Sequence, residues 1–65
     1  MTPNDLRDLR DSWGMYLREA AAMVGVQTRS WQRWEAGEAP IPPPVERLLR
    51  LCEDDAVRKR LLEMK

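Results

Sequence analysis

The sequence predicts a small all-α domain of five helices. Apolar side chains recur at three- and four-residue intervals, and glycine follows each of the first three apolar stretches. No stretch alternates apolar and polar residues as a half-buried strand would. A chain of 65 residues has room for one hydrophobic core, so we expect a single domain over residues 1 to 65. A domain this small buries only about 60% of its unfolded surface, so a partner or dimer would help it.

The first predicted helix covers about residues 3 to 13. Thr2 can cap its free amides, Pro3 suits its first position, and Asp5 stands three residues after the cap. Gly14 permits a left-handed end. One apolar stripe consists of Leu6, Leu9 and Trp13.

The next two predicted helices cover about residues 17 to 24 and 28 to 36. Three consecutive alanines in the second allow another helix to approach closely, and Gly25 permits a sharp turn between the two helices. Trp31 and Trp34 share one side of the third helix. On its opposite side lie Arg29, Gln32 and Arg33.

Four prolines make residues 38 to 45 a stiff, extended connector. A fourth helix is expected from Pro44 to near Glu53, and a carboxylate of Asp54 or Asp55 can cap a fifth helix that runs to the end of the chain. The fourth helix has its apolar stripe at Val45, Leu48, Leu49 and Cys52. We expect Cys52 to be a small buried apolar residue and not a redox sensor.

The composition excludes several classes of function. Lys plus Arg (11) equals Asp plus Glu (11), so the chain lacks the overall positive charge that alone indicates nucleic-acid binding. It has no histidine and one cysteine, so we expect no metal, no cofactor and no internal disulfide. We expect no enzyme, because paired acid and nucleophile groups are missing. Without a membrane-spanning apolar run or a signal peptide, a cytoplasmic protein is expected.

The spacing across the second and third helices resembles the helix-turn-helix family typified by the lambda Cro and cI repressors (XRE-like). The resemblance covers residues 3 to 52, with the helix-turn-helix proper at 17 to 36. It is carried by Trp13-Gly14-Met15, Arg18-Glu19-Ala20-Ala21, Gly25-Val26 and Trp34-Glu35-Ala36-Gly37, followed by Pro40-Ile41-Pro42. The resemblance implies a lambda-repressor-like, DNA-binding transcriptional regulator of bacterial or phage type. Such a protein is commonly a homodimer on a palindromic, double-stranded operator, and we expect a repressor.

The candidate DNA contacts lie on and beside the third helix. Arginine matches the two acceptors of guanine, and glutamine can pair with adenine. The predicted base-reading residues are Thr28, Arg29, Gln32 and Arg33. The predicted phosphate contacts are Tyr16, Arg18, Gln27 and Ser30, and we also expect Arg10 to reach a phosphate. The alternative for the arginines is that they are ordinary solvated charges.

Two positions depart from the family pattern. Tyr16 and Leu17 stand where the family usually has a capping Ser or Thr and a phosphate-contacting glutamine, so Leu17 is a packing or partner surface. Gln27 stands where Ser or Thr usually caps the third helix. We therefore expect Thr28 to take over as the cap, which would shift the helix start by one residue.

Residues 44 to 64 carry more large apolar side chains than the core of a small monomer needs. The predicted dimer interface consists of Leu51, Leu61, Leu62 and Met64, and the alternative is that these residues only close the core. Another alternative keeps the fold but makes it an antitoxin-like or other protein-binding module. In a third, Trp31 and Trp34 are exposed and stack on single-stranded nucleic acid, although we expect them in the core.

Overall fold

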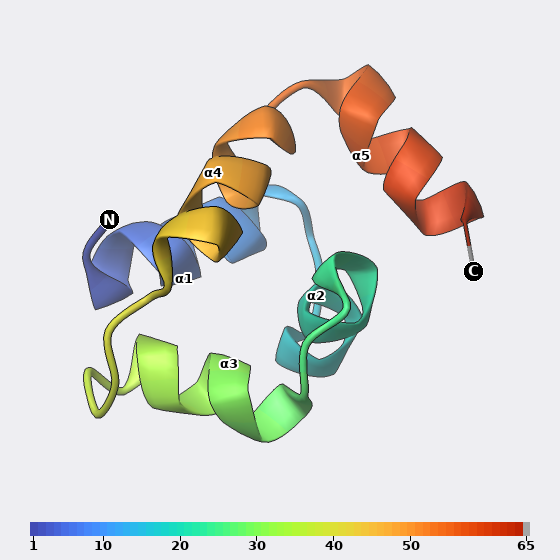
Figure 1. Ribbon diagram of the computed structural model, residues 1–65. Coiled ribbons are helices and arrows are strands. Elements are labelled where there is room, and N and C mark those ends of the chain that lie inside the picture. The colour runs from blue at the N-terminus through green and yellow to red at the C-terminus, as the bar shows by residue number, and fades with distance from the viewer. Residues whose placement is uncertain (65) are drawn as a thin grey trace.

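The computed structural model describes residues 1–64, and within them it contains five helices and no strand. This confirms the predicted all-α class. Figure 1 shows α3 facing α1 and α4 across the interior, and α5 leading away from the end of α4. The helices are α1 (Pro3–Ser12), α2 (Leu17–Val24), α3 (Thr28–Glu35), α4 (Pro43–Leu51) and α5 (Asp55–Glu63). The predicted extension of the fifth helix to residue 65 lies outside the described residues.

Side-chain caps start the first and last helices as the sequence predicts. The Thr2 hydroxyl accepts a hydrogen bond from the Asp5 amide at 3.1 Å, and the Thr2 amide donates to the Asp5 carboxylate at 3.0 Å. These two bonds form a complete capping box. At α5, the Asp54 carboxylate accepts from the Ala56 amide at 2.8 Å. Both helix starts are therefore set by contacts within a few residues of chain.

The turn between α2 and α3 depends on Gly25, whose φ of 76° is left-handed. The amide of Gly25 donates to the Ala22 carbonyl, and that of Val26 donates to the Ala21 carbonyl. These bonds satisfy the carbonyls that the end of a helix leaves free. The chain can therefore leave α2 and enter α3 within a few residues.

Three helix boundaries differ from the sequence prediction by a residue. α1 ends at Ser12, α3 ends at Glu35, and α4 begins at Pro43, where Pro42 is the N-cap. The expectation that Thr28 caps α3 is wrong. The Gln27 carbonyl accepts from the amides of Ser30 and Trp31, so Gln27 is the N-cap, and its side chain makes no capping bond.

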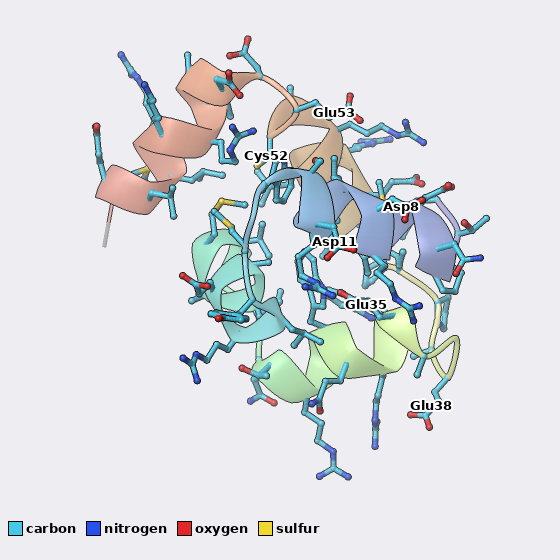
Figure 2. The ribbon with its side chains drawn as sticks, turned by 180° about the vertical axis from the view of Figure 1, so that it is seen from behind. Asp8, Asp11, Glu35, Glu38, Cys52 and Glu53 are labelled. Atoms are coloured by element: carbon cyan, nitrogen blue, oxygen red, sulfur yellow. The ribbon has the colours of Figure 1, made fainter. Side chains whose placement is uncertain are left out.

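Helix α5 packs against α2, and Arg58 adds two contacts that hold it to the rest of the domain. None of its residues is buried. The guanidinium of Arg58 lies 5.5 Å from the centre of the Trp13 ring and donates to the Cys52 carbonyl at 3.1 Å. Cys52 itself lies at the end of α4 (Figure 2) and is fully buried, as predicted, and this burial raises the pKa of its thiol.

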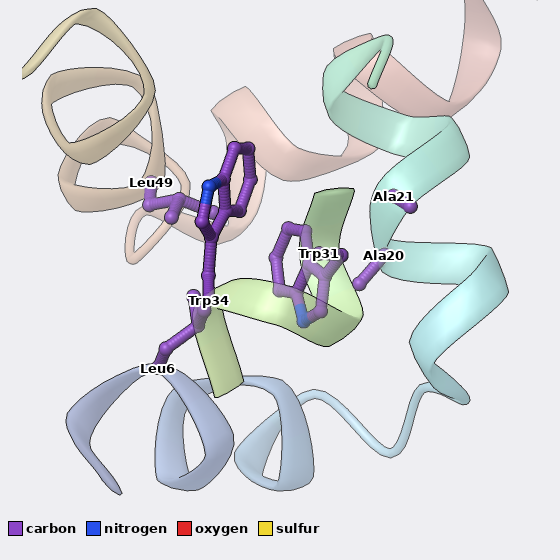
Figure 3. Close-up of a cluster of buried hydrophobic side chains, with 6 residues drawn as sticks. All are labelled: Leu6, Ala20, Ala21, Trp31, Trp34 and Leu49. Carbon is purple, nitrogen blue, oxygen red and sulfur yellow. The ribbon is translucent and has the colours of Figure 1, made fainter. Parts of the chain in front are cut away.

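The core lies where α1, α2, α3 and α4 meet (Figure 3). Trp31 is fully buried, which settles the question of its exposure that the sequence left open. Figure 3 shows its indole facing the alanines of α2, while the indole of Trp34 points toward α4. The two ring centres are 6.1 Å apart and the ring planes are tilted by 50°, an arrangement typical of favourable aromatic pairs. The buried cluster comprises Leu6, Ala20, Ala21, Trp31, Trp34 and Leu49.

Candidate nucleic-acid interface

Helix α3 presents a polar face away from the core. Because Trp31 and Trp34 are both buried, the 100° turn per residue directs the intervening side chains outward. Figure 2 shows nitrogen-tipped side chains extending from α3 away from the rest of the molecule. The predicted base-reading residues are all exposed: Thr28, Arg29, Gln32 and Arg33.

Two shallow hollows flank this outer face of α3. The first, which we term the α2–α3 hollow, is lined by Tyr16, Leu17, Arg18, Thr28 and Gln32. The second, which we term the arginine hollow, is lined by Gln27, Arg29, Ser30 and Arg33. The fold therefore brings all the predicted base and phosphate contacts except Arg10 to the two hollows beside α3. Leu17 joins them in the first hollow.

The lining of both hollows contains no carboxylate. The guanidinium of Arg18 lies 5.7 Å from the centre of the Tyr16 ring, and that ring is 70% exposed. A carboxylate lies nearby at the start of α2, where Glu19 accepts from the Tyr16 amide at 2.9 Å. This bond supplies the cap that the sequence of α2 otherwise lacks. Residues 26 to 34 contain Arg29 and Arg33 and no acidic residue, and both arginines are exposed, so this face of α3 carries local positive charge.

A buried ion pair holds α3 against α1. Arg10 donates from Nε to Glu35 Oε2 at 2.7 Å and from Nη2 to Glu35 Oε1 at 3.0 Å. Its third nitrogen donates to the Met15 carbonyl at 3.0 Å. The indole nitrogen of Trp31 donates to the same Glu35 carboxylate. One carboxylate therefore links α1 to α3 and orients the indole in the core.

The side chain of Glu35 is only 8% exposed. Burial alone raises the pKa of a carboxyl, but here the hydrogen bonds from Arg10 and Trp31 outweigh burial, and the pKa of Glu35 lies below its ordinary value. Glu35 is therefore charged at neutral pH, and its charge is paired. In Figure 2 it lies between α3 and α1.

The structure corrects the expectation for Arg10. All of its guanidinium nitrogens are engaged by Glu35 and Met15, so it holds two helices together and is not free for a phosphate. The sequence contained a signal for this role that we did not use. Glu35 lies one helical turn after Trp31 on the same face, and a carboxylate on a buried face needs a cationic partner.

The apolar residues predicted for a dimer interface line neither of the two hollows. Leu51, Leu62 and Met64 are 60%, 37% and 78% exposed, and Leu61 is half-buried. They belong to α4, α5 and the residue after α5. Their role as an interface stays a prediction.

Two further findings describe residues 1–64 as a whole. No helix among them is both long and apolar enough to cross a membrane. Their His, Cys, Asp and Glu side chains include no cluster arranged to hold a metal ion.

Comparison with known proteins finds a matching family and a similar phage protein. The profile of the Aca2/YdiL-like family matches residues 1–65. A protein named "Aca2 repressor" from Pectobacterium phage ZF40 is 40% identical over 70 residues, which cover 97% of this chain and 60% of that protein. This chain therefore spans about 60% of the length of that relative. No solved structure matches significantly. These matches indicate a helix-turn-helix regulator family, and they do not single out the Cro and cI branch.

Proposed function

This chain belongs to the Aca2/YdiL-like family, and from this premise we propose that it is a sequence-specific, double-stranded DNA-binding transcriptional repressor. It occupies a palindromic operator as a homodimer, with α3 of each copy in the major groove. The name of the phage relative, a repressor, supports repression. Such a protein would act in the cytoplasm of a bacterium or of a phage-infected host.

The observation that carries the proposal is the outer face of α3. Among residues 1–64, neither Arg29 nor Arg33 forms an ion pair, and both are exposed beside Gln32. Guanidinium groups held free on a helix of this orientation can reach guanine, while the amide of Gln32 can reach adenine. Ordinary solvated arginines would need no such fixed helix, whereas α3 is held by two buried indoles and the Glu35 ion pair.

The charge balance determines how this affinity arises. The chain has a formal net charge of zero, so attraction to phosphates of any sequence is weak and falls further as salt rises. Useful affinity then depends on base contacts and on two copies bound at once. The exposed Leu51, Leu62 and Met64 support a dimer, because a small domain gains by covering such side chains.

The test is the selection of bound duplexes from a random pool. We expect an enriched palindrome with half-sites one helical turn apart, because two α3 helices on one face of the DNA stand about 34 to 36 Å apart. Fluorescence anisotropy then compares the enriched duplex with a random one. Equal affinity for both would contradict specific DNA binding.

A second candidate is the protein-binding module. The neutral net charge and the exposed apolar side chains of α4 and α5 favour it. No enrichment in the duplex selection, together with a monomeric mass in light scattering, would support this candidate. The single-strand alternative has lost its basis, because Trp31 and Trp34 are both buried and offer no stacking surface.

A further inference from the structure

The α2–α3 hollow contains an apolar side chain that the proposed DNA contacts leave unused. Leu17, the first residue of α2, is half-buried and packs against the core cluster, and it lines the hollow beside Thr28 and Gln32. The arginine hollow differs, because polar side chains alone line it. The two sides of α3 therefore offer different chemistry to whatever covers them.

In the major groove, only one base presents an apolar group. Thymine carries a 5-methyl, whereas the groove edges of the other three bases consist of hydrogen-bond donors and acceptors. The adenine paired with that thymine presents an acceptor and a donor that match a glutamine amide. An A·T pair thus has the same combination of apolar and amide-binding groups that Leu17, Thr28 and Gln32 provide.

We propose that Leu17, together with the methyl group of Thr28, forms the contact for a thymine methyl, so that the α2–α3 hollow reads an A·T pair. This inference rests on the proposed DNA-binding function and adds Leu17 as a residue that determines specificity. It divides the reading surface in two. The arginine hollow reads guanine, and the α2–α3 hollow reads adenine and thymine.

The surroundings of the hollow favour DNA over an apolar protein segment. Arg18 is exposed on its rim, with its guanidinium beside the Tyr16 ring. A cation at the edge of an apolar contact suits a base, because phosphates flank every base on the strand. The same cation would oppose the burial of an apolar peptide, which could not pair with it.

The experiment replaces thymine by deoxyuridine, which removes only the 5-methyl group. Each thymine in one half-site of the selected operator is replaced in turn, and affinity is measured by fluorescence anisotropy. For the unmodified protein we expect one position at which the loss of the methyl weakens binding about 4-fold, the value of one buried methyl-sized group. Leu17→Ala should bind the thymine and deoxyuridine duplexes equally at that position.

Leu9→Ala is the matched control. Leu9 is also a half-buried leucine packed against the core, but it lies on α1 and outside the hollow. It should keep the full difference between thymine and deoxyuridine. If Leu17→Ala does not fold, as judged by circular dichroism, Leu17→Gln replaces it. Glutamine has a side chain of similar length to leucine but ends in a polar amide in place of the two methyl groups.

The outcomes separate the two proposals. Failure of the selection to enrich any duplex would overturn the proposed function itself. An enriched operator without a methyl-sensitive thymine, or a methyl sensitivity that survives in the Leu17 variants, would overturn the role of Leu17 and leave DNA binding intact. Sensitivity that is present in the unmodified protein and in Leu9→Ala, and absent in the Leu17 variants, supports it.

Discussion

Replacing Arg10 with methionine tests the ion pair that positions α3. Methionine replaces the apolar stem of arginine with an unbranched apolar side chain of similar helix propensity, so α1 itself should be unaffected. The substitution removes both hydrogen bonds to Glu35 and the bond to the Met15 carbonyl. It leaves a carboxylate that is only 8% exposed with the Trp31 indole as its remaining close donor.

The expected loss of unfolding free energy follows from the burial of the Arg10–Glu35 ion pair. Removing one partner of a buried ion pair costs about 3 to 5 kcal/mol. Arg10 retains 16% exposure, and Arg7 lies 3.8 Å from the carboxylate, so we expect about 3 kcal/mol, the low end of that range. A domain of 65 residues has a total unfolding free energy of about 3 to 10 kcal/mol. The variant should therefore lose a third or more of its stability.

The dependence on pH identifies the cause. The folded-state pKa of Glu35 is lowered, so its contribution is fully present above the unfolded pKa of about 4.3 and disappears as the pH falls through the folded value. In Arg10→Met the pKa of Glu35 loses its largest lowering influence. The difference in unfolding free energy between the two proteins should therefore be largest at neutral pH and should shrink toward pH 3.

The assay is urea denaturation followed by circular dichroism at neutral and acidic pH. Arg7→Met is the matched control: it lies on the same helix, is 53% exposed, and should cost less than about 1 kcal/mol, as exposed pairs do. If Arg10→Met costs no more than Arg7→Met, or if its cost is the same at both pH values, the ion pair does not hold α3 against α1.

The remaining predictions concern DNA binding, the core and the dimer. Arg29→Ala and Arg33→Ala should each weaken operator binding about 5-fold or more with unchanged helicity, since one good base contact discriminates by about 1 to 3 kcal/mol. Arg47→Ala, an exposed arginine on α4, is the control, and equal effects at all three would refute the assignment. Trp34→Ala should cost about 3 to 5 kcal/mol through the cavity that it leaves, so the cooperative thermal transition should be lost; a retained transition would mean that α4 closes the gap. Leu51→Glu changes a side chain that is 60% exposed, so it should reduce a dimeric mass in light scattering and leave the fold intact. A monomeric mass before and after the change would argue against the α4–α5 interface.

Much of the fold follows from local sequence because its signals act over a few residues. The hydroxyl of Thr2 and the carboxylate of Asp54 satisfy amides within three positions of themselves. Gly25 adopts a backbone angle that other residues rarely take. The outward direction of Arg29 and Gln32 also follows, since helical geometry places them opposite the indoles once the core side of α3 is known.

The errors at helix boundaries have a local cause as well. Each of the prolines at 42, 43 and 44 fits the first turn of a helix, so the sequence alone does not show which of them begins α4. Thr28 is a better capping side chain than Gln27. The chain nevertheless begins α3 with the Gln27 carbonyl, which accepts from the amides of Ser30 and Trp31, so the backbone bonds set this helix start without a side-chain cap.

The sequence by itself determined the helices, their order and the exposed face of α3, since hydrogen bonds and side-chain periodicity within single segments specify these features. Only the tertiary structure decided that Trp31 is fully buried, that Arg10 pairs with Glu35, and that Leu17 meets Thr28 in one hollow. Arg10 and Glu35 are 25 residues apart in the chain. No spacing rule connects positions so distant, because their meeting depends on how α1, α2 and α3 pack around the same core.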